Sequence, residues 1–236
     1  ASSGIGLSVA SELLNRGFKV LGIDLNNADK SISTNKNYKH LLMDLSLIHE
    51  IPKNRFLIDH ISNFEGLVNS AGITLNMSTE IEEKINIFEK TLSINLLAPY
   101  TISELFYRYR NEPFNQSSIV NVSSIGAVQG FSDNPSYCSS KGALESLTRS
   151  LAIDYSKKNI RVNTIRPGYT ETPMNIDSLS NPLKKNHRSN HTILGRWAKP
   201  CEIAKGVLFL LSEESSYITG SAITVDGGWT KLGMTR

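Results

Sequence analysis

The sequence predicts an α/β protein built on a doubly wound parallel sheet, with helices on both faces and one strand missing at the start. Short apolar runs alternate with longer segments of helical periodicity, and a glycine-rich turn opens the first helix. Such alternation is typical of a parallel sheet with helical crossovers. The 236 residues contain no Pro/Gly/Ser-rich linker, so we expect one domain over 1–236.

A glycine-rich turn leads into the first predicted helix. Residues 1–6 read Ala-Ser-Ser-Gly-Ile-Gly, and a helical pattern follows as far as Gly17. The free N–H groups and positive dipole at such a helix start stabilise a pyrophosphate. The strand that would lead into the turn is missing from the sequence. We therefore expect roughly ten more residues before Ala1, the length of one short strand plus its turn.

The other elements follow in alternation. Strands are predicted from the short apolar runs at 18–24, 38–44, 66–69, 117–123, 160–165 and 222–225. Helices are predicted at 47–61, 83–110, 135–157 and 200–212. Only the connection at 25–37, which is rich in Asn, Ser, Lys and Asp, looks poorly helical.

The composition argues against several classes of protein. The formal net charge is +3 with both signs interspersed, which is too slight to indicate nucleic-acid binding. Cys138 and Cys201 form neither a disulfide framework nor a metal framework. The chain has no apolar run of 18 residues and no secretory signal. We therefore expect a cytoplasmic protein that binds neither nucleic acid nor membrane.

The most informative residues are a tyrosine and a lysine four positions apart. Tyr137 and Lys141 share one face of a predicted helix, and Ser124 lies thirteen residues before the tyrosine. An ammonium there favours phenolate, so we expect the pKa of Tyr137 to fall from roughly 10 toward the working pH. Such a tyrosine exchanges a proton with an alcohol or carbonyl oxygen. Alone, however, the Tyr-Lys spacing also fits a surface pair.

Several motifs, in order, resemble those of the short-chain dehydrogenase/reductase family over essentially the whole chain. Residues 1–6 resemble the end of its Thr-Gly-x-x-x-Gly-x-Gly turn, and 69–72 its Asn-Asn-Ala-Gly motif with serine in second place. Residues 166–172 resemble its Pro-Gly segment beside nicotinamide, and 225–228 its C-terminal strand. The resemblance implies a Rossmann-type fold and an NAD(P)-dependent oxidoreductase of CH–OH groups.

The same resemblance implies the catalytic residues Asn95, Ser124, Tyr137 and Lys141. Tyr137 would be the general acid/base, and Ser124 would orient the substrate oxygen, so both are also expected substrate contacts. Lys141 would bind the nicotinamide ribose, and Asn95 would hold a water linking Lys141 to solvent. No metal is expected, because His187 and His191 have no evident third ligand.

Asp24 favours NAD(H) over NADP(H). It ends a predicted strand eighteen residues after Gly6, where a carboxylate binds ribose hydroxyls and repels a 2′-phosphate. The expected cofactor-binding residues are Ser3, Gly4, Ile5, Gly6, Asp24, Asp44, Leu45, Asn69, Ala71, Gly72, Tyr137, Lys141, Pro167, Gly168, Thr170 and Thr172.

Some of these assignments have alternatives. Asp44 could contact adenine or cap the helix that begins near Ser46. Asn69 could bind the ribose or a neighbouring backbone group. Thr172 is the preferred hydroxyl for the nicotinamide carboxamide, whereas Thr170 could simply bond its local turn.

The preferred function is oxidation or reduction of a secondary alcohol or ketone of polyol, sugar or sugar-derivative type. One alternative is a 3-oxoacyl-(acyl-carrier-protein) reductase that uses NADPH, and another is a non-catalytic dinucleotide sensor or scaffold. Residues 173–198 are expected to form a substrate lid. The basic cluster at 184–188 within it is interpreted as a solvated loop. The resemblance also implies a homodimer or homotetramer.

Overall fold

In the computed structural model, which describes residues 1–110 and 116–232, parallel strands form two hydrogen-bonded groups. In the first group β1 (Val20–Asp24) pairs with β2 (Tyr38–Leu42). The second group contains, in spatial order, β3 (Gly66–Asn69), β4 (Ser117–Val122), β5 (Ile160–Pro167) and β6 (Ala222–Val225).

The strand order reverses between the two groups. The chain runs outward from β1 to β2, returns to β3, and then proceeds outward to β6. In such a doubly wound arrangement, ligands bind beyond the carboxyl ends of the strands where the order reverses. The described residues of β1 and β3 are not paired with each other. The expected strand before Ala1 stays a prediction.

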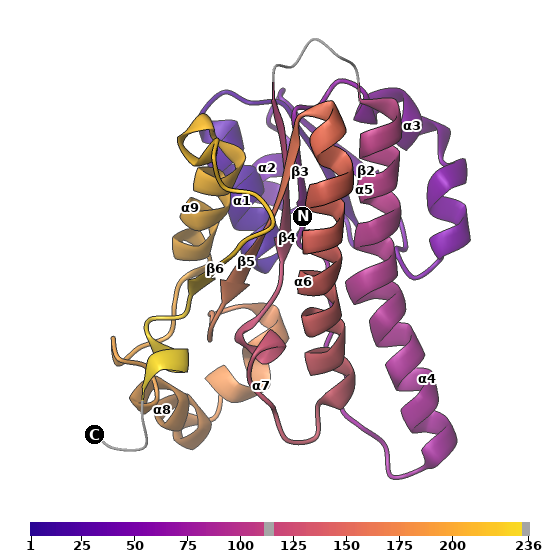
Figure 1. Ribbon diagram of the computed structural model, residues 1–236. Helices are drawn as coiled ribbons and strands as arrows, with labels where there is room; N and C mark the ends of the chain where they lie inside the picture. Colours follow the sequence, from indigo (N-terminus) through magenta and orange to yellow (C-terminus); the bar gives the residue numbers. More distant parts are fainter. Residues whose placement is uncertain (111–115, 233–236) are drawn as a thin grey trace.

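Helices cover the sheet on both faces, as the sequence predicts (Figure 1). Their bounds are α1 (Gly4–Asn15), α2 (Lys30–Ser33), α3 (Arg55–Ile61), α4 (Ile81–Leu92), α5 (Ala98–Tyr109), α6 (Pro135–Tyr155), α7 (Ile176–Leu179), α8 (Pro182–Asn190) and α9 (Pro200–Leu211). No helix within the described ranges is long and apolar enough to cross a bilayer.

Two apolar cores follow from the alternation of side chains along the strands. In β4, Ile119 belongs to the core shared with α3, α5 and α6, whereas Val120 belongs to the core shared with α1 and α9. Both side chains are completely buried, which contributes roughly 1.5–3 kcal/mol each. A strand that is covered on both faces therefore needs apolar residues at consecutive positions, as β4 has.

The predicted helix at 47–61 is wrong as a continuous helix. A 3₁₀ helix occupies Ile48–Lys53 and contains Pro52, and α3 begins afresh at Arg55. Proline has no N–H to donate and clashes with the preceding turn, so it interrupts an α-helix. The Asn54 side chain then accepts a hydrogen bond from the N–H of Leu57 (2.9 Å) and caps α3.

The predicted helix at 83–110 is interrupted as well. A π-helical turn at Ser93–Leu97 separates α4 from α5. Pro99 has no N–H for the carbonyl four residues earlier, that of Asn95, which accounts for a wider turn here. Single π turns inside helices are frequent at functional sites.

The remaining differences are small. The connection at 25–37 contains the one-turn helix α2, whose first turn is capped by Asp29 (Oδ1 to the N–H of Ser31, 2.8 Å). β2 ends at Leu42, two residues earlier than predicted, and β5 continues to Pro167. The 173–198 segment contains α7 and α8, which lie together at one end of the sheet (Figure 1).

Candidate active site

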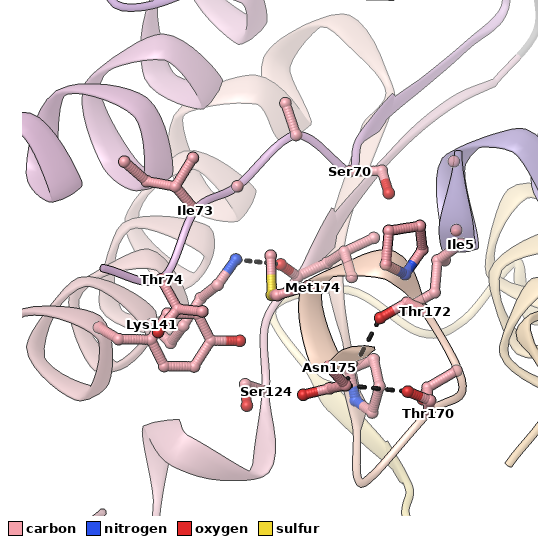
Figure 2. A pocket seen from close by; sticks show the side chains of 18 of the residues that line it. Ile5, Ser70, Ile73, Thr74, Ser124, Lys141, Thr170, Thr172, Met174 and Asn175 are labelled. Carbon is pink, nitrogen blue, oxygen red and sulfur yellow. Dashed lines mark hydrogen bonds between the residues drawn. The ribbon is translucent and has the colours of Figure 1, made fainter. Parts of the chain in front are cut away.

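A cavity of about 720 Å³ lies at the carboxyl ends of the strands (Figure 2). Its walls come from the start of α1 and from the segments that follow β1, β2, β3, β4 and β5. This is the position where a doubly wound sheet binds its ligand. All of the predicted site residues line the cavity except Asn69 and Asn95.

Asn69 is not a cavity residue. Its amide nitrogen donates to Oγ of Ser103 (3.1 Å) and to Oδ1 of Asn121 (2.8 Å) on the neighbouring strand β4. The side chain is 7% exposed. Its side chain thus links β3 to β4 and α5, and its binding to the cofactor stays a prediction.

Asn95 lies behind the cavity wall. Its Oδ1 accepts from the N–H of Ile73 (2.8 Å), and its Nδ2 donates to Ile73 O (2.9 Å) and Ser140 Oγ (3.0 Å). The side chain is completely buried. A Cβ added at Gly72 would lie 3.3 Å from both Asn95 Oδ1 and Lys141 Nζ. Asn95 thus ties the loop after β3 to α6, and its amide is committed to these bonds.

Ser124, Tyr137 and Lys141 meet at the cavity. Ser124 ends β4 as the cap of a short turn, where its Oγ accepts from the N–H of Gly126 (3.0 Å). The Ser124 hydroxyl lies close enough to Tyr137 to lower the pKa of its phenol. Lys141, one helical turn after Tyr137, donates from Nζ to Val122 O (2.8 Å), as Figure 2 shows.

Burial sets the protonation of this group. It raises the pKa of Tyr137, although the nearby Ser124 hydroxyl acts in the opposite direction. The expected fall in that pKa is therefore wrong for this structure. Lys141 Nζ lies 5.8 Å from the Tyr137 ring centroid and is directed to Val122 O. Burial also lowers the pKa of Lys141 to about 8.

A buried ion pair supports the catalytic segment, and sequence analysis missed it. Arg166 binds Glu145 through two hydrogen bonds, Nε to Oε1 (2.9 Å) and Nη2 to Oε2 (2.6 Å). Ser123 Oγ also donates to Glu145 Oε1 (3.0 Å). The sequence does contain a pattern that could have identified Glu145, because this residue continues the four-residue spacing of Tyr137 and Lys141 along one helix face.

Asp24 lies at the end of β1, as predicted. Its carboxylate accepts from the backbone N–H groups of Ser2 (2.9 Å) and Asn26 (3.0 Å). Burial raises the pKa of Asp24, and these two backbone hydrogen bonds lower it.

Asp44 holds the turn after β2, while the 3₁₀ helix that follows has Leu47 at its N-cap, so Asp44 does not cap that helix, and its contact with adenine stays a prediction. It lines the cavity, and its Oδ1 accepts from the N–H of Ser46 (2.8 Å). The backbone hydrogen bond from Ser46 lowers the pKa of Asp44.

The cavity fits a nicotinamide dinucleotide. The glycine turn is closely packed: Gly4 has φ +54°, and a Cβ added at Gly6 would lie 3.4 Å from Ser70 Oγ. The Thr170 hydroxyl is buried without a hydrogen-bond partner among the described residues, as expected of a group that binds a ligand. Thr172 Oγ1, in contrast, accepts from Asn175 (3.5 Å; Figure 2).

The cavity also contains residues that the sequence did not single out. Tyr169 and Phe131 line it, their ring centroids 6.2 Å apart. Trp229 packs edge-on against Tyr169 (5.7 Å). Trp197 is buried, and its ring centroid lies 5.2 Å from that of Tyr169. Arg188 lines the cavity, so interpreting it as part of a solvated loop was wrong.

The fold and the site together define a dinucleotide-dependent oxidoreductase. Residues 1–230 match the family profile described as enoyl-(acyl carrier protein) reductase. The chain belongs to the short-chain dehydrogenase/reductase family. It is an NAD(P)-dependent oxidoreductase that acts on an alcohol or ketone.

Three relatives illustrate the range of this similarity. L-xylulose reductase of Caenorhabditis elegans is 32% identical over 98% of this chain and 93% of that protein. 3-Oxoacyl-(acyl-carrier-protein) reductase FabG of Thermotoga maritima is 31% identical over 97% and 94%. The structure is similar to 4-hydroxyisoleucine dehydrogenase complexed with NADH, with a TM-score of 0.89 and 30% identity over 99% and 97% of the two chains.

Proposed function

We propose that this chain transfers a hydride between NAD(H) and a secondary alcohol or ketone of polyol, sugar or sugar-derivative type. The observation that carries the proposal is that Tyr137, Ser124 and Lys141 line one cavity together with the glycine turn and Asp24. A proton-transfer group and a dinucleotide-binding turn thereby share one space.

The side chains have distinct roles in this mechanism. The cofactor, when bound, accepts or supplies the hydride. Tyr137 takes the proton from the alcohol or returns it to the carbonyl oxygen, and Ser124 orients that oxygen. Because burial raises the pKa of Tyr137, the phenol is the proton donor for carbonyl reduction at neutral pH. Lys141 would hold the nicotinamide ribose, and Asn95, whose amide bonds Ile73 and Ser140, would hold a water that links Lys141 to solvent.

The preference for NAD(H) rests on charge. Asp24 and Asp44 are the charged side chains that follow β1 and β2 in the cavity wall. The cationic side chains of the lining, Lys141 and Arg188, come from α6 and α8 instead. A 2′-phosphate would therefore meet a carboxylate without a nearby lysine or arginine to compensate.

The second candidate is a 3-oxoacyl-(acyl-carrier-protein) reductase that uses NADPH. The 31% identity to FabG of Thermotoga maritima favours it, and Asp24 opposes it. A non-catalytic sensor is the third, and the presence of Ser124, Tyr137 and Lys141 together argues against it.

The test is a parallel fluorescence titration of the full-length protein with NADH and NADPH, followed by assays with sugar alcohols and aldoses. Tighter NADH binding with turnover supports the proposal. Tighter NADPH binding would overturn the Asp24 argument and favour the 3-oxoacyl reductase. Binding without turnover of any substrate would favour the sensor.

Three further expectations stay predictions. Residues 173–198 would act as a substrate lid, which is supported by Met174 and Arg188 in the cavity wall. A homodimer or homotetramer is supported by exposed apolar side chains on and beside α4 and α5, such as Ile85 and Tyr100. A cytoplasmic location rests on the sequence alone.

A further inference from the structure

We propose that Arg188 binds a carboxylate of the substrate, so that within the proposed substrate class sugar acids and other hydroxy or oxo acids are preferred over neutral polyols. The inference rests on the proposed function and names the chemistry of its substrate. Three observations support it: the position of Arg188 in the cavity, the absence of a described protein acceptor for its guanidinium, and the charges around it.

Arg188 is held in place by aromatic rings. It lies on α8, is half-buried, and lines the same cavity as Ser124 and Tyr137. Its guanidinium carbon lies 4.5 Å from the ring centroid of Tyr169 and 5.7 Å from that of Trp197. Stacking uses the faces of the guanidinium and leaves the N–H groups at its edge available for a planar oxyanion.

The edge of this guanidinium has no acceptor in the protein. Within the described part of the chain, no carboxylate and no carbonyl accepts a hydrogen bond from it. Other arginines shielded from solvent are paired. Arg161 donates to Gln116 and to backbone carbonyls, and Arg166 donates to Glu145. The N–H groups of Arg188 are thus not committed to the protein and are available to a ligand oxyanion in the cavity.

The surrounding charges favour an anion. The lining carboxylates, Asp24 and Asp44, follow β1 and β2, whereas Arg188 shares its part of the wall with segments that follow β4 and β5. Tyr169 and Phe131 also lower the local polarity, which strengthens a charge-assisted hydrogen bond.

A second unsatisfied group suits a hydroxy acid. Oδ1 of Asn134 is buried without a partner among the described residues, while its Nδ2 donates to Thr74 Oγ1 (2.8 Å). Asn134 lines the cavity, so its free acceptor can take a hydrogen bond from a substrate hydroxyl.

In the oxidation, the CH–OH carbon gives a hydride to NAD⁺ and the hydroxyl proton passes to the phenolate form of Tyr137, which first releases its own proton to solvent. The products are an oxo acid, NADH and one proton. The carboxylate remains unchanged, because it serves only to bind Arg188.

The experiment compares substrates that differ in the carboxylate, using the full-length enzyme with NAD⁺. We expect kcat/KM to be at least about tenfold higher for gluconate than for sorbitol, or for 3-hydroxybutyrate than for 2-butanol. Arg188→Met, which keeps an unbranched apolar stem, should lower the acid-to-neutral ratio at least about tenfold, chiefly through KM. Arg188→Lys should restore it only in part, because an ammonium has no planar fork.

A matched control separates local binding from net charge. Arg196→Met removes the same charge from an exposed arginine that pairs with Glu202 (2.6 Å), and it should leave the acid-to-neutral ratio as it is. A readout independent of turnover is competition by butyrate and butyramide, which differ in charge but little in shape. Butyrate should bind more tightly to the wild-type enzyme with NADH, and Arg188→Met should remove the difference.

Four outcomes would overturn the inference. They are preference for the neutral alcohols, equal losses for acids and neutral alcohols in Arg188→Met, the same ratio change in Arg196→Met, and tighter competition by inorganic phosphate than by butyrate. The last would mean that the bound oxyanion is a phosphate. An enzyme that oxidises no alcohol but still binds butyrate through Arg188 would contradict only the proposed function.

Discussion

The two ends of the cavity are built differently. At the end formed by β1 and β2, the carboxylates of Asp24 and Asp44 are already satisfied by backbone N–H groups. At the other end, polar atoms of Asn134 and Thr170 are buried without partners in the described ranges.

The two ends therefore differ in how far their hydrogen bonds are complete before a ligand binds. The first end uses residues close together along the chain, such as Asp24 with Asn26 and Asp44 with Ser46, so it is organised before any ligand arrives. The second end assembles residues from distant segments and leaves hydrogen-bonding capacity for a ligand to complete. Ligand-dependent effects should therefore concentrate at the second end.

The largest expected effect comes from Tyr137→Phe. It should lower kcat at least ~10²-fold, because the general acid/base is lost. NADH affinity should change far less, since the β1 and β2 end is untouched. Steady-state kinetics and fluorescence titration check this separation. Near wild-type turnover would contradict the assignment of Tyr137.

Lys141→Met tests the cost of a buried ammonium. Lys141 is 4% exposed and its pKa is lowered to about 8 from 10.5, so the charged form destabilises the fold by roughly 3 kcal/mol at neutral pH. The variant should lose activity yet unfold at higher urea concentration at pH 7.

The pH dependence gives the control for that prediction. Between about pH 8 and 10.5 the unfolded chain holds the Lys141 proton and the folded protein does not, so wild-type stability gains with rising pH. The advantage of Lys141→Met should thus shrink from pH 7 to pH 10. An advantage that is constant over this range would count against the burial argument.

Asp24→Asn tests the β1 and β2 end. It removes the charge that would repel a 2′-phosphate, so the ratio of NADH to NADPH kcat/KM should fall about tenfold. The matched control is Asp29→Asn, which alters an exposed carboxylate that caps α2. An equal shift in both variants would show that the effect comes from net charge.

Thr170→Val should give the smallest effect and distinguishes the two ends most directly. The Thr170 hydroxyl is buried and has no hydrogen-bond partner among the described residues. Its removal should raise the free energy of unfolding, measured in the absence of NADH, by about 1 kcal/mol. If Thr170 binds the nicotinamide, the stabilisation by added NADH should decrease. Thermal unfolding with and without NADH measures both stabilities. A Thr170→Val variant that is no more stable than the wild type in the absence of NADH would contradict the claim that this hydroxyl is buried without a partner.

Sequence reasoning succeeded where the chemistry is local. Ser124, Tyr137 and Lys141 follow from the end of one strand and the four-residue period of one helix, and the structure places all three at the cavity. It failed where a single residue changes backbone geometry, as at Pro52 in the predicted helix 47–61. The hydrogen bonds of Asn69 could not be predicted, because its partners on β4 and α5 are distant in the chain.

The sequence by itself determined the alternation of strands and helices, the family, and the spacing of Ser124, Tyr137 and Lys141, the proposed catalytic residues, because these depend on periodicity and short spacings. Only the tertiary structure decided that Tyr137 has a raised pKa, since burial depends on everything packed around it. It also decided that Arg188 meets Tyr169 and Trp197 at the cavity. Contacts between residues far apart in the chain form only when the whole fold brings them together, and no local pattern encodes them.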